Sequence, residues 1–405
     1  MSSLKDANPA SGATPTWGTI SWTAAVPDGT DVKFQAAASN SPLGPFAFVG
    51  PDGTASTYFG NGASLAQFNG SRYLKYKAVL STSKGAATPV LSDVTVCFED
   101  VPAVTTLSVD PASGPYQGTT TLSATLSAGG VRLAGRTIAF TLLGTSVGSA
   151  VTDGAGVATI PGVSLAGISA GTHPDGVAAS FAGEPGYAAS TGSSTLGVAR
   201  APLSVKADDQ SKLLNAPNPP LTGVLTGVLD GDNITATYTT TAVTTSPVGA
   251  YPIVPVLVDP DGRLGNYDVT IVNGTLTIGY ASGGLCLGSP GHEVLPPLDA
   301  SGSRVVQQKS TVPVKFRVCD ANGVSVGTPG VVASFQLVQI IQGSVVTSTS
   351  ATPVSTTPDT TFRWDAVAQQ WIFNLSTKNL AGGATYVYRI VLADGSAITF
   401  RFTLK

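Results

Sequence analysis

Short runs of alternating apolar and polar residues, each closed by Gly, Pro, Asn or Asp, dominate this sequence. Residues 31–38 (DVKFQAAA) follow the turn signal Pro-Asp-Gly at residues 27–29, and residues 74–80 (LKYKAVL) repeat the pattern. A period of two sends successive side chains to opposite faces of a strand. The sequence therefore predicts half-buried antiparallel strands joined by tight turns, each with one solvent-facing side.

The composition favours several small β domains over one large core. The chain has 405 residues with 47 Gly and 28 Pro, and its 11% of charged residues is less than half of the roughly 25% usual in globular proteins. At about 100 residues per domain this length predicts several modules. We expect an all-β protein of tandem β-sandwich or Ig-like modules arranged as an elongated rod.

Charge and hydropathy exclude two classes of partner. A net charge of -3 without any basic run leaves no surface that would attract a phosphate backbone, so we expect no nucleic-acid binding. No window approaches 18 consecutive apolar residues, so we expect no membrane insertion. Residues 1–10 lack the basic and apolar regions of a secretory signal, so we expect either that a signal was removed or that a longer polypeptide precedes them.

Pattern changes near residues 102, 200 and 281 divide the chain into blocks. We expect a flexible N-terminal segment (1–16) and four modules: the first block (17–101), the second block (102–199), the third block (200–280) and the fourth block (281–405).

The first two blocks resemble modules of bacterial secreted proteins. Residues 72–76 (RYLKY) and 88–94 (TPVLSDV) resemble a jelly-roll-like module. Residues 116–119 (YQGT), 135–140 (GRTIAF) and 177–187 (VAASFAGEPGY) resemble a bacterial Ig-like repeat. The regular spacing of short strands favours a sandwich independently of the resemblance.

The last two blocks carry further resemblances. Residues 244–253 (TTSPVGAYPI) and 266–278 resemble the MBG module of bacterial surface proteins. Residues 310–318 (STVPVKFRV) contain the motif of the PxKF module, and residues 361–365 and 370–375 are similar to its tail. Together the resemblances imply an extracellular or cell-surface protein of a bacterium.

Local signals make two further predictions at the end of the third block. The step Asn273-Gly274 suits a type I′ turn, so we expect a hairpin there. Residues 280–284 (YASGG) read as a short flexible linker into the fourth block. In the fourth block, Val312, Val314, Phe316 and Val318 should share one strand face, and Ile398, Phe400, Phe402 and Leu404 another.

Three cysteines bear on the compartment. Cys286 and Cys319 fall in the same block, 33 positions apart, and a disulfide is our preferred interpretation, with two buried free thiols as the alternative. Cys97 should lie on the opposite strand face from Val96 and Phe98, as a buried thiol, a free surface thiol or an interchain link.

Candidate binding residues are few. Loop aromatics of the first block could stack on sugar rings, although core packing is the simpler interpretation. These candidate glycan-stacking residues are Trp17, Phe46, Phe48, Tyr58 and Phe59. Two turns offer oxygen ligands for calcium, but each lacks the further ligands of a calcium loop, so plain turns are favoured. The candidate calcium residues are Asp230, Asp232, Asp259 and Asp261.

No catalytic constellation stands out. His173 and His292 both lie in Gly/Pro-rich stretches without a nucleophile motif nearby. We therefore expect no enzyme activity and no cofactor, and a structural, adhesion or spacer role toward a surface ligand, glycan or protein, with self-association as an option. The alternatives are a carbohydrate-binding accessory region of a larger secreted hydrolase and a filament subunit joined by strand addition through residues 7–15 or another edge.

Overall fold

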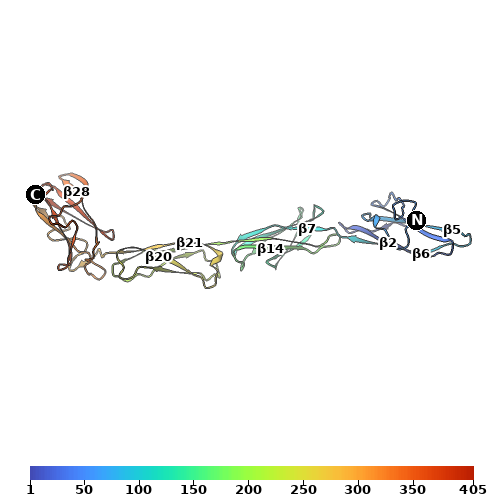
Figure 1. Cartoon of the computed structure of the whole chain (residues 1–405), viewed down its shortest axis with the longest axis horizontal. Coiled ribbons are helices and arrows are strands. Elements are labelled where there is room, and N and C mark those ends of the chain that lie inside the picture. Colours follow the sequence, from blue (N-terminus) through green and yellow to red (C-terminus); the bar gives the residue numbers. More distant parts are fainter. The chain divides into compact units, whose positions relative to one another are not determined.

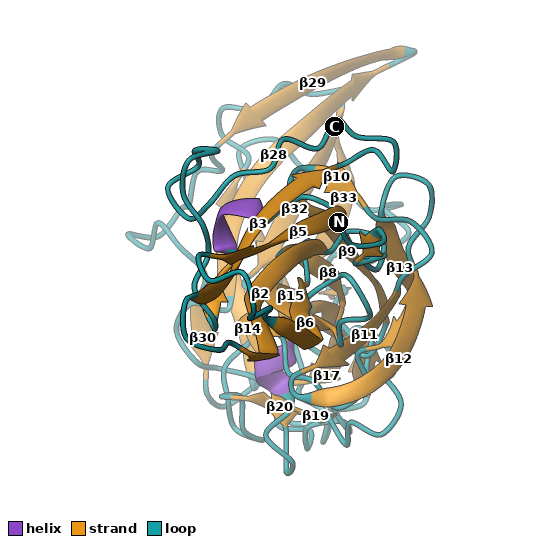
Figure 2. Ribbon diagram, turned by 90° about the vertical axis from the view of Figure 1, so that its right-hand side faces the viewer, coloured by secondary structure: helices purple, strands orange, loops and turns teal.

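The computed structural model describes residues 1–405 and confirms the all-β class. Figure 2 shows strands and loops almost throughout, interrupted by two single turns of 3₁₀ helix, η1 (Ala66–Phe68) and η2 (Leu264–Asn266). The chain forms two compact units, Met1–Arg200 and Ala201–Lys405.

Two three-stranded sheets build the first block, in the orders β1-β5-β3 and β4-β2-β6. Figure 1 labels β2, β5 and β6 of this block close to the N-terminus. The strands are β1 (Lys5–Asp6), β2 (Thr14–Ala25), β3 (Thr30–Ser39), β4 (Ala63–Ser64), β5 (Tyr73–Thr82) and β6 (Val90–Val101). Trp17, Ile20, Phe34, Phe59 and Leu74 are buried together between the sheets. Burying such large side chains is what holds a small sandwich together.

The N-terminal segment is not the flexible tail that the sequence suggested. Lys5 and Asp6 pair with Leu74 and Tyr73 of β5, and Ala7 is buried in the core. Asp6 also forms an ion pair with Arg72, at 2.8 Å. The segment is ordered because its backbone donors and acceptors extend an existing sheet. A strand of two residues is too short to show an alternation of apolar and polar side chains in the sequence.

The second block is a sandwich of a four-stranded sheet, β10-β9-β13 with β7 against β9, and a five-stranded sheet, β12-β11-β14-β15-β8. Its strands are β7 (Thr105–Val109), β8 (Ala112–Pro115), β9 (Thr119–Ala128), β10 (Val131–Arg132), β11 (Thr137–Leu142), β12 (Thr145–Val151), β13 (Val157–Ser164), β14 (Gly171–Phe181) and β15 (Ser190–Ala199). Leu122, Leu126, Phe140, Val177 and Leu196 are buried within this block.

The third block has two sheets, β18-β16-β21 and β17-β22-β20-β19. Its strands are β16 (Ala201–Ala207), β17 (Gln210–Leu213), β18 (Gly223–Thr226), β19 (Thr235–Thr240), β20 (Gly249–Val258), β21 (Tyr267–Val272) and β22 (Gly274–Gly279). Ala207, Ile253, Leu276 and Ile278 form its small core.

The predicted hairpin at Asn273-Gly274 is wrong. β21 pairs with β16 in one sheet, whereas β22 pairs with β20 and β17 in the other, so the chain crosses between sheets at this step. Gly274 is needed for space, because a Cβ there would lie 2.5 Å from the carbonyl oxygen of Asp208. At this step the glycine permits two backbone segments to approach closely and does not form a turn.

The fourth block is a sandwich of the sheets β25-β27-β31-β30 and β26-β33-β32-β28-β29, preceded by the small pair β23-β24. Its strands are β23 (Leu285–Cys286), β24 (Ser289–Pro290), β25 (Val294–Leu295), β26 (Val305–Val306), β27 (Thr311–Phe316), β28 (Val332–Gln342), β29 (Val345–Ala351), β30 (Arg363–Asp365), β31 (Gln370–Ser376), β32 (Thr385–Leu392) and β33 (Ala397–Leu404).

Both predicted strand faces of the fourth block are confirmed. All eight side chains of the two faces are 3% exposed or less: Val312, Val314, Phe316, Val318, Ile398, Phe400, Phe402 and Leu404. The predicted linker is shorter than expected, because Tyr280 is buried in this core and the Ala281 amide donates to the Cys319 carbonyl. Only Ser282 to Gly284 remain as a connecting turn.

Candidate functional site

The loop between β3 and β4 carries the most distinctive surface of the first block. Val49 exchanges two backbone hydrogen bonds with Ala36, and the Phe59 amide donates to Phe34. These bonds add the loop to the edge of β3, so the alternation of a strand continues through it. Phe59 and Val49 therefore face inward, while Phe48 and Tyr58 face the opposite side of the sheet.

Three lysines of the sheet lie over three aromatic rings of this loop. The Nζ atoms of Lys75, Lys77 and Lys33 lie 4.7, 5.6 and 5.8 Å from the ring centres of Phe46, Phe48 and Tyr58 respectively. Cation–π pairs at this distance stabilise an exposed surface by about 0.5–1 kcal/mol each. We call these six residues the aromatic–lysine face.

Buried hydrogen bonds hold the loop against the sheet. Gln35 is 1% exposed, although its place in the alternation predicts a wet face, and its side-chain amide donates to the carbonyls of Ala55 and Thr57. Asp52 accepts from the Thr54 amide and from the hydroxyls of Thr54 and Thr57, and the bond from Thr57 is the main reason that its pKa is lowered. The face is thus built on an ordered loop.

Two of the five candidate glycan-stacking residues lie in the core and not on the surface. Trp17 and Phe59 are 1% and 2% exposed and belong to the core, and Trp17 Nε1 donates to the Ser71 carbonyl. A ring enclosed on both sides cannot stack on a sugar, so these two assignments are corrected. Phe46 and Phe48 are half-buried and Tyr58 is 38% exposed, and these three share one face.

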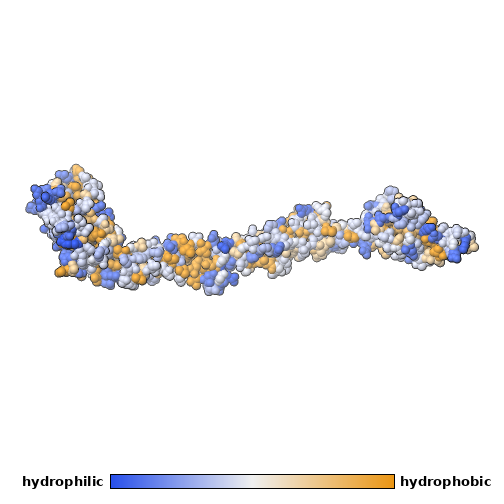
Figure 3. All heavy atoms as spheres, in the orientation of Figure 1, coloured by the Kyte–Doolittle hydropathy of each residue, from blue (hydrophilic) through white to orange (hydrophobic).

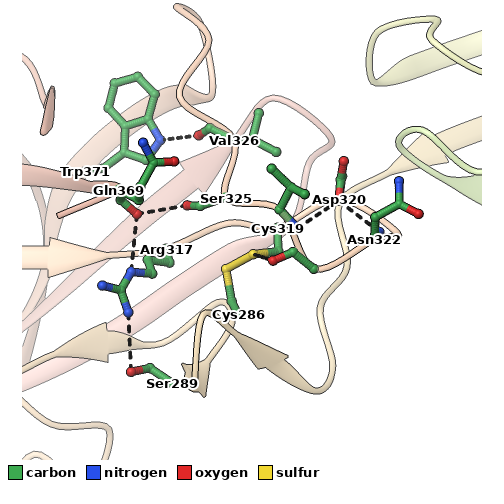
Figure 4. The surroundings of a disulfide bond; sticks show 12 residues. Cys286, Ser289, Arg317, Cys319, Asp320, Asn322, Ser325, Val326, Gln369 and Trp371 are labelled. Atoms are coloured by element: carbon green, nitrogen blue, oxygen red, sulfur yellow. Dashed lines mark hydrogen bonds between the residues drawn. A yellow bond between two sulfur atoms is a disulfide. The ribbon is translucent and has the colours of Figure 1, made fainter. Parts of the chain in front are cut away.

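A disulfide joins Cys286 of β23 to Cys319, with 5.6 Å between their Cα atoms. Figure 4 shows it beside a network that ties the adjoining turns together. Arg317 donates to the carbonyls of Gln369 and Ala368, and the Ser325 hydroxyl also donates to the Gln369 carbonyl. The disulfide therefore braces the start of the fourth block, where the strands are short. Cys97 is free and exposed on β6.

Three of the four aspartates considered for calcium accept hydrogen bonds from neighbouring groups. Both carboxylate oxygens of Asp259 accept backbone amides, from Arg263 and Leu264 at 2.9 and 2.7 Å, at the start of η2. Asp232 accepts from the Tyr267 hydroxyl, and Asp261 from the Asn233 side chain. Asp230 lies in the adjoining turn, and nowhere do three or more His, Cys, Asp or Glu side chains gather as a metal site would require.

The structure places a serine and an aspartate beside His292, which the sequence did not indicate. His292 Nε2 lies 3.1 Å from Ser396 Oγ, and that hydroxyl donates to Asp394 at 2.5 Å. The serine thus stands between histidine and aspartate, whereas in a catalytic triad the histidine takes that place. Burial lowers the pKa of His292 and raises that of Tyr280 to about 12. A ring nitrogen of His173 lies 2.9 Å from the Ser169 carbonyl oxygen.

The same cluster belongs to a joint between the third and fourth blocks. The Tyr280 amide donates to Asp394, Asn215 Nδ2 donates to Asp320 at 2.7 Å, and the Ala321 amide donates to the Leu214 carbonyl. Leu214 packs against the cores of both blocks. Such a joint combines apolar burial with hydrogen-bonded carboxylates and therefore restrains the two blocks relative to each other.

An uncharged sheet face marks the third block. Val254, Val256 and Val258 of β20 are 38–43% exposed and lie opposite Thr239, Thr237 and Thr235 of β19. Figure 3 shows residues of high hydropathy gathered over this block, where Figure 1 places β20 and β21. An exposed apolar patch of this kind is typical of an interaction surface.

Residues 203–277 match the family model of the MBG domain (YGX type), which agrees with the resemblance of the third block. No curated protein matches the chain. The chain contains no helix with the length and apolar character needed to cross a bilayer.

Three solved structures illustrate what the chain is similar to. A Ca²⁺-stabilized adhesin that helps an Antarctic bacterium reach out and bind ice is 15% identical, with a TM-score of 0.26, over 98% of this chain and 95% of that one. The three N-terminal domains of the bacteriophage RB49 Hoc protein are 11% identical, with a TM-score of 0.31, over 74% and 99%. Domains 4–9 of the surface layer protein SbsC are 12% identical, with a TM-score of 0.15, over 95% and 66%.

Proposed function

We propose that the protein is an exported, non-enzymatic bacterial protein whose β modules space and present binding surfaces outside the cell. The Cys286–Cys319 disulfide carries this proposal, because such bonds persist in oxidising compartments and are rare in the cytosol. The MBG domain in residues 203–277 supports it, since the sequence resemblance was to modules of bacterial surface proteins.

The proposed division into modules is part of this function. Separate sheets in each of the four blocks, and separate buried clusters in the first, third and fourth, support boundaries near residues 102, 200 and 281. Limited proteolysis of the native chain tests it, with cleavage expected at exposed turns close to those positions. A single resistant core of full length would refute the division.

The aromatic–lysine face favours a second, more specific function: binding of acidic carbohydrate. Its three rings offer apolar surface for stacking, but each already carries an ammonium group, so a neutral sugar would have to displace a lysine. A carboxylate or sulfate on the sugar would instead pair with the displaced lysine. Asp31 neutralises only Lys33, through an ion pair at 2.7 Å, which leaves Lys75 and Lys77 for such a ligand.

A glycan array that includes uronic-acid and sulfated sugars tests this binding function. Retention of acidic sugars that falls with salt and is lost in the Lys75→Ala/Lys77→Ala variant supports it. The matched control is Lys84→Ala, which removes a lysine of the same block that lies over no ring. If the control loses binding equally, or if no acidic sugar binds at all, the proposed binding of acidic carbohydrate is contradicted and only the spacer role stands.

Assembly by strand addition through residues 7–15 receives no support, because Ala7 is buried and β2 already begins at Thr14. The β19 edge of the third block is an alternative acceptor, since β19 pairs with β20 on one side only. Light scattering of the purified chain over a range of concentrations distinguishes a self-assembling protein from a monomeric spacer.

A further inference from the structure

The fourth block contains an aromatic cavity of about 550 Å³, a volume in the range of small-ligand sites. Phe335, Phe362, Trp364, Trp371 and Phe373 line it, and neighbouring ring centres lie 5.1–5.4 Å apart. Phe335 and Trp364 are only half-buried, so the cavity opens to the surface. The sandwich is therefore incompletely closed at this place.

An unpaired backbone edge runs along the mouth of this cavity. β28 pairs with β32 from Val332 onward but with β29 only from Leu337, which lies opposite Ala351. Residues 332–336 thus have a strand on one side alone, and Val332 to Phe335 also line the cavity. Exposed amides and carbonyls of this kind are a template for another strand.

The chain itself cannot continue β29 along that edge. Pro353 lacks an amide hydrogen and follows Ala351 by two residues, so the ladder ends there. Beyond it, Val354 and Thr356 bond to Ser376 and Asn374, in the opposite sheet. The departure of the chain leaves one strand position open directly over the aromatic cavity.

The chemistry of the lining identifies the kind of occupant. The aromatic rings line the cavity together with the hydroxyl residues Ser334, Thr352, Thr360 and Thr361, and no charged side chain and no Asn, Gln, His or Tyr contributes, so the lining favours an uncharged occupant. Apolar side chains match this lining, and an extended backbone matches the free edge. Two of the rings are held in place. Trp371 Nε1 donates to the Val326 carbonyl (Figure 4), and Trp364 packs so closely on Gly327 that a Cβ there would lie 2.2 Å from the ring, which agrees with a preformed site.

From these observations we infer that the fourth block accepts an extended, uncharged peptide strand of a partner protein. The strand pairs with residues 332–336 of β28 and places alternate apolar side chains in the aromatic cavity. Main-chain hydrogen bonds supply affinity in this mode, and the pocket supplies selectivity for the side chains. This binding is separate from the aromatic–lysine face of the first block.

The test uses the full chain and a fluorescent peptide, acetyl-Thr-Val-Thr-Phe-Thr-Val-Thr-amide, with fluorescence anisotropy as the readout. Two further peptides carry N-methyl groups on one or the other set of alternate amides. Strand pairing predicts that one set weakens binding at least about tenfold, while the other set leaves it unchanged, because only one set faces β28. No binding, or equal effects of the two sets, would overturn the inference.

A variant locates the site on the protein. Thr352→Trp narrows the mouth of the cavity and should weaken binding by at least about tenfold, whereas Thr347→Trp, on the exposed part of β29 outside the cavity, should leave it unchanged. Thermal unfolding of both variants checks that the block remains folded. Equal affinity of a folded Thr352→Trp variant would place the peptide elsewhere and contradict the inference.

Discussion

The side chain of Asn215 donates a 2.7 Å hydrogen bond to the carboxylate of Asp320, and this bond joins the third block to the fourth. Asp320 is 4% exposed and also accepts the amides of Asn322 and Val324. Burial alone would raise the pKa of Asp320, but these hydrogen bonds, led by that of Asn215, hold it below its usual value. The carboxylate is therefore charged and fully bonded at neutral pH.

Replacing Asn215 should loosen this joint. Asn215→Asp tolerates the positive φ of 63° that Asn adopts here, but it sets a second carboxylate against Asp320. Loss of a hydrogen bond to a charged group costs about 1.5–3 kcal/mol, so hydrogen exchange at the Ala321 amide, which bonds across the joint, should accelerate at least about tenfold. Asn215→Gly keeps the backbone conformation without the repulsion and should accelerate it less. Unchanged exchange in both variants would contradict the role of this bond.

His292 should make the fourth block sensitive to mild acid. Burial lowers its pKa in the folded protein, with the Asp394 carboxylate opposing, while an unfolded imidazole titrates near about 6.5. As pH falls through that value, the unfolded chain takes up the proton first. The contribution of neutral His292 to the free energy of unfolding is therefore fully present above pH of about 7 and declines toward pH of about 5.

The urea midpoint of the block at several pH values between those limits measures this effect. His292→Gln should flatten the decline, whereas His173→Gln, in the second block, should leave it as it is. A decline that persists in the His292 variant would assign the acid sensitivity to another group.

Removing the disulfide should destabilise the fourth block. Closing a loop of 33 residues stabilises a fold by about 4 kcal/mol in the chain-entropy model, so Cys286→Ala/Cys319→Ala should lower the free energy of unfolding by about that amount. Cys97→Ala, which removes an exposed thiol of the first block, should change it by less than about 0.5 kcal/mol. Equal stabilities of all three proteins would show that the bond does not brace the block.

Periodicity predicted the strands well because burial follows it directly. The inward faces of β27 and β33 are those that alternation assigns, since every second residue of each strand meets the opposite sheet. Gln35 departs from the pattern because a loop distant in sequence covers it. Alternation describes one strand and carries no information on what packs over it.

Contacts between distant segments explain the remaining differences. Asn273-Gly274 has the local signature of a turn, but whether its flanking strands pair depends on β16 and β20, which lie far away in the sequence. Likewise, Ser396 and Asp394 lie about 100 positions from His292, and no motif spacing connects them. Residue type alone points to Phe46, Phe48 and Tyr58, whereas the positions of Lys75, Lys77 and Lys33 over their rings depend on the register of β3 and β5.

We propose that this protein is exported and that an oxidised cysteine pair braces its fourth block. Mass spectrometry of unreduced peptides, prepared from the protein in its native compartment with thiols blocked at lysis, tests it most directly. We predict a peptide pair linked through Cys286 and Cys319 and a blocked, free Cys97. Three blocked thiols in the folded native protein would contradict this proposal, because the cysteine pair of an exported protein should be oxidised.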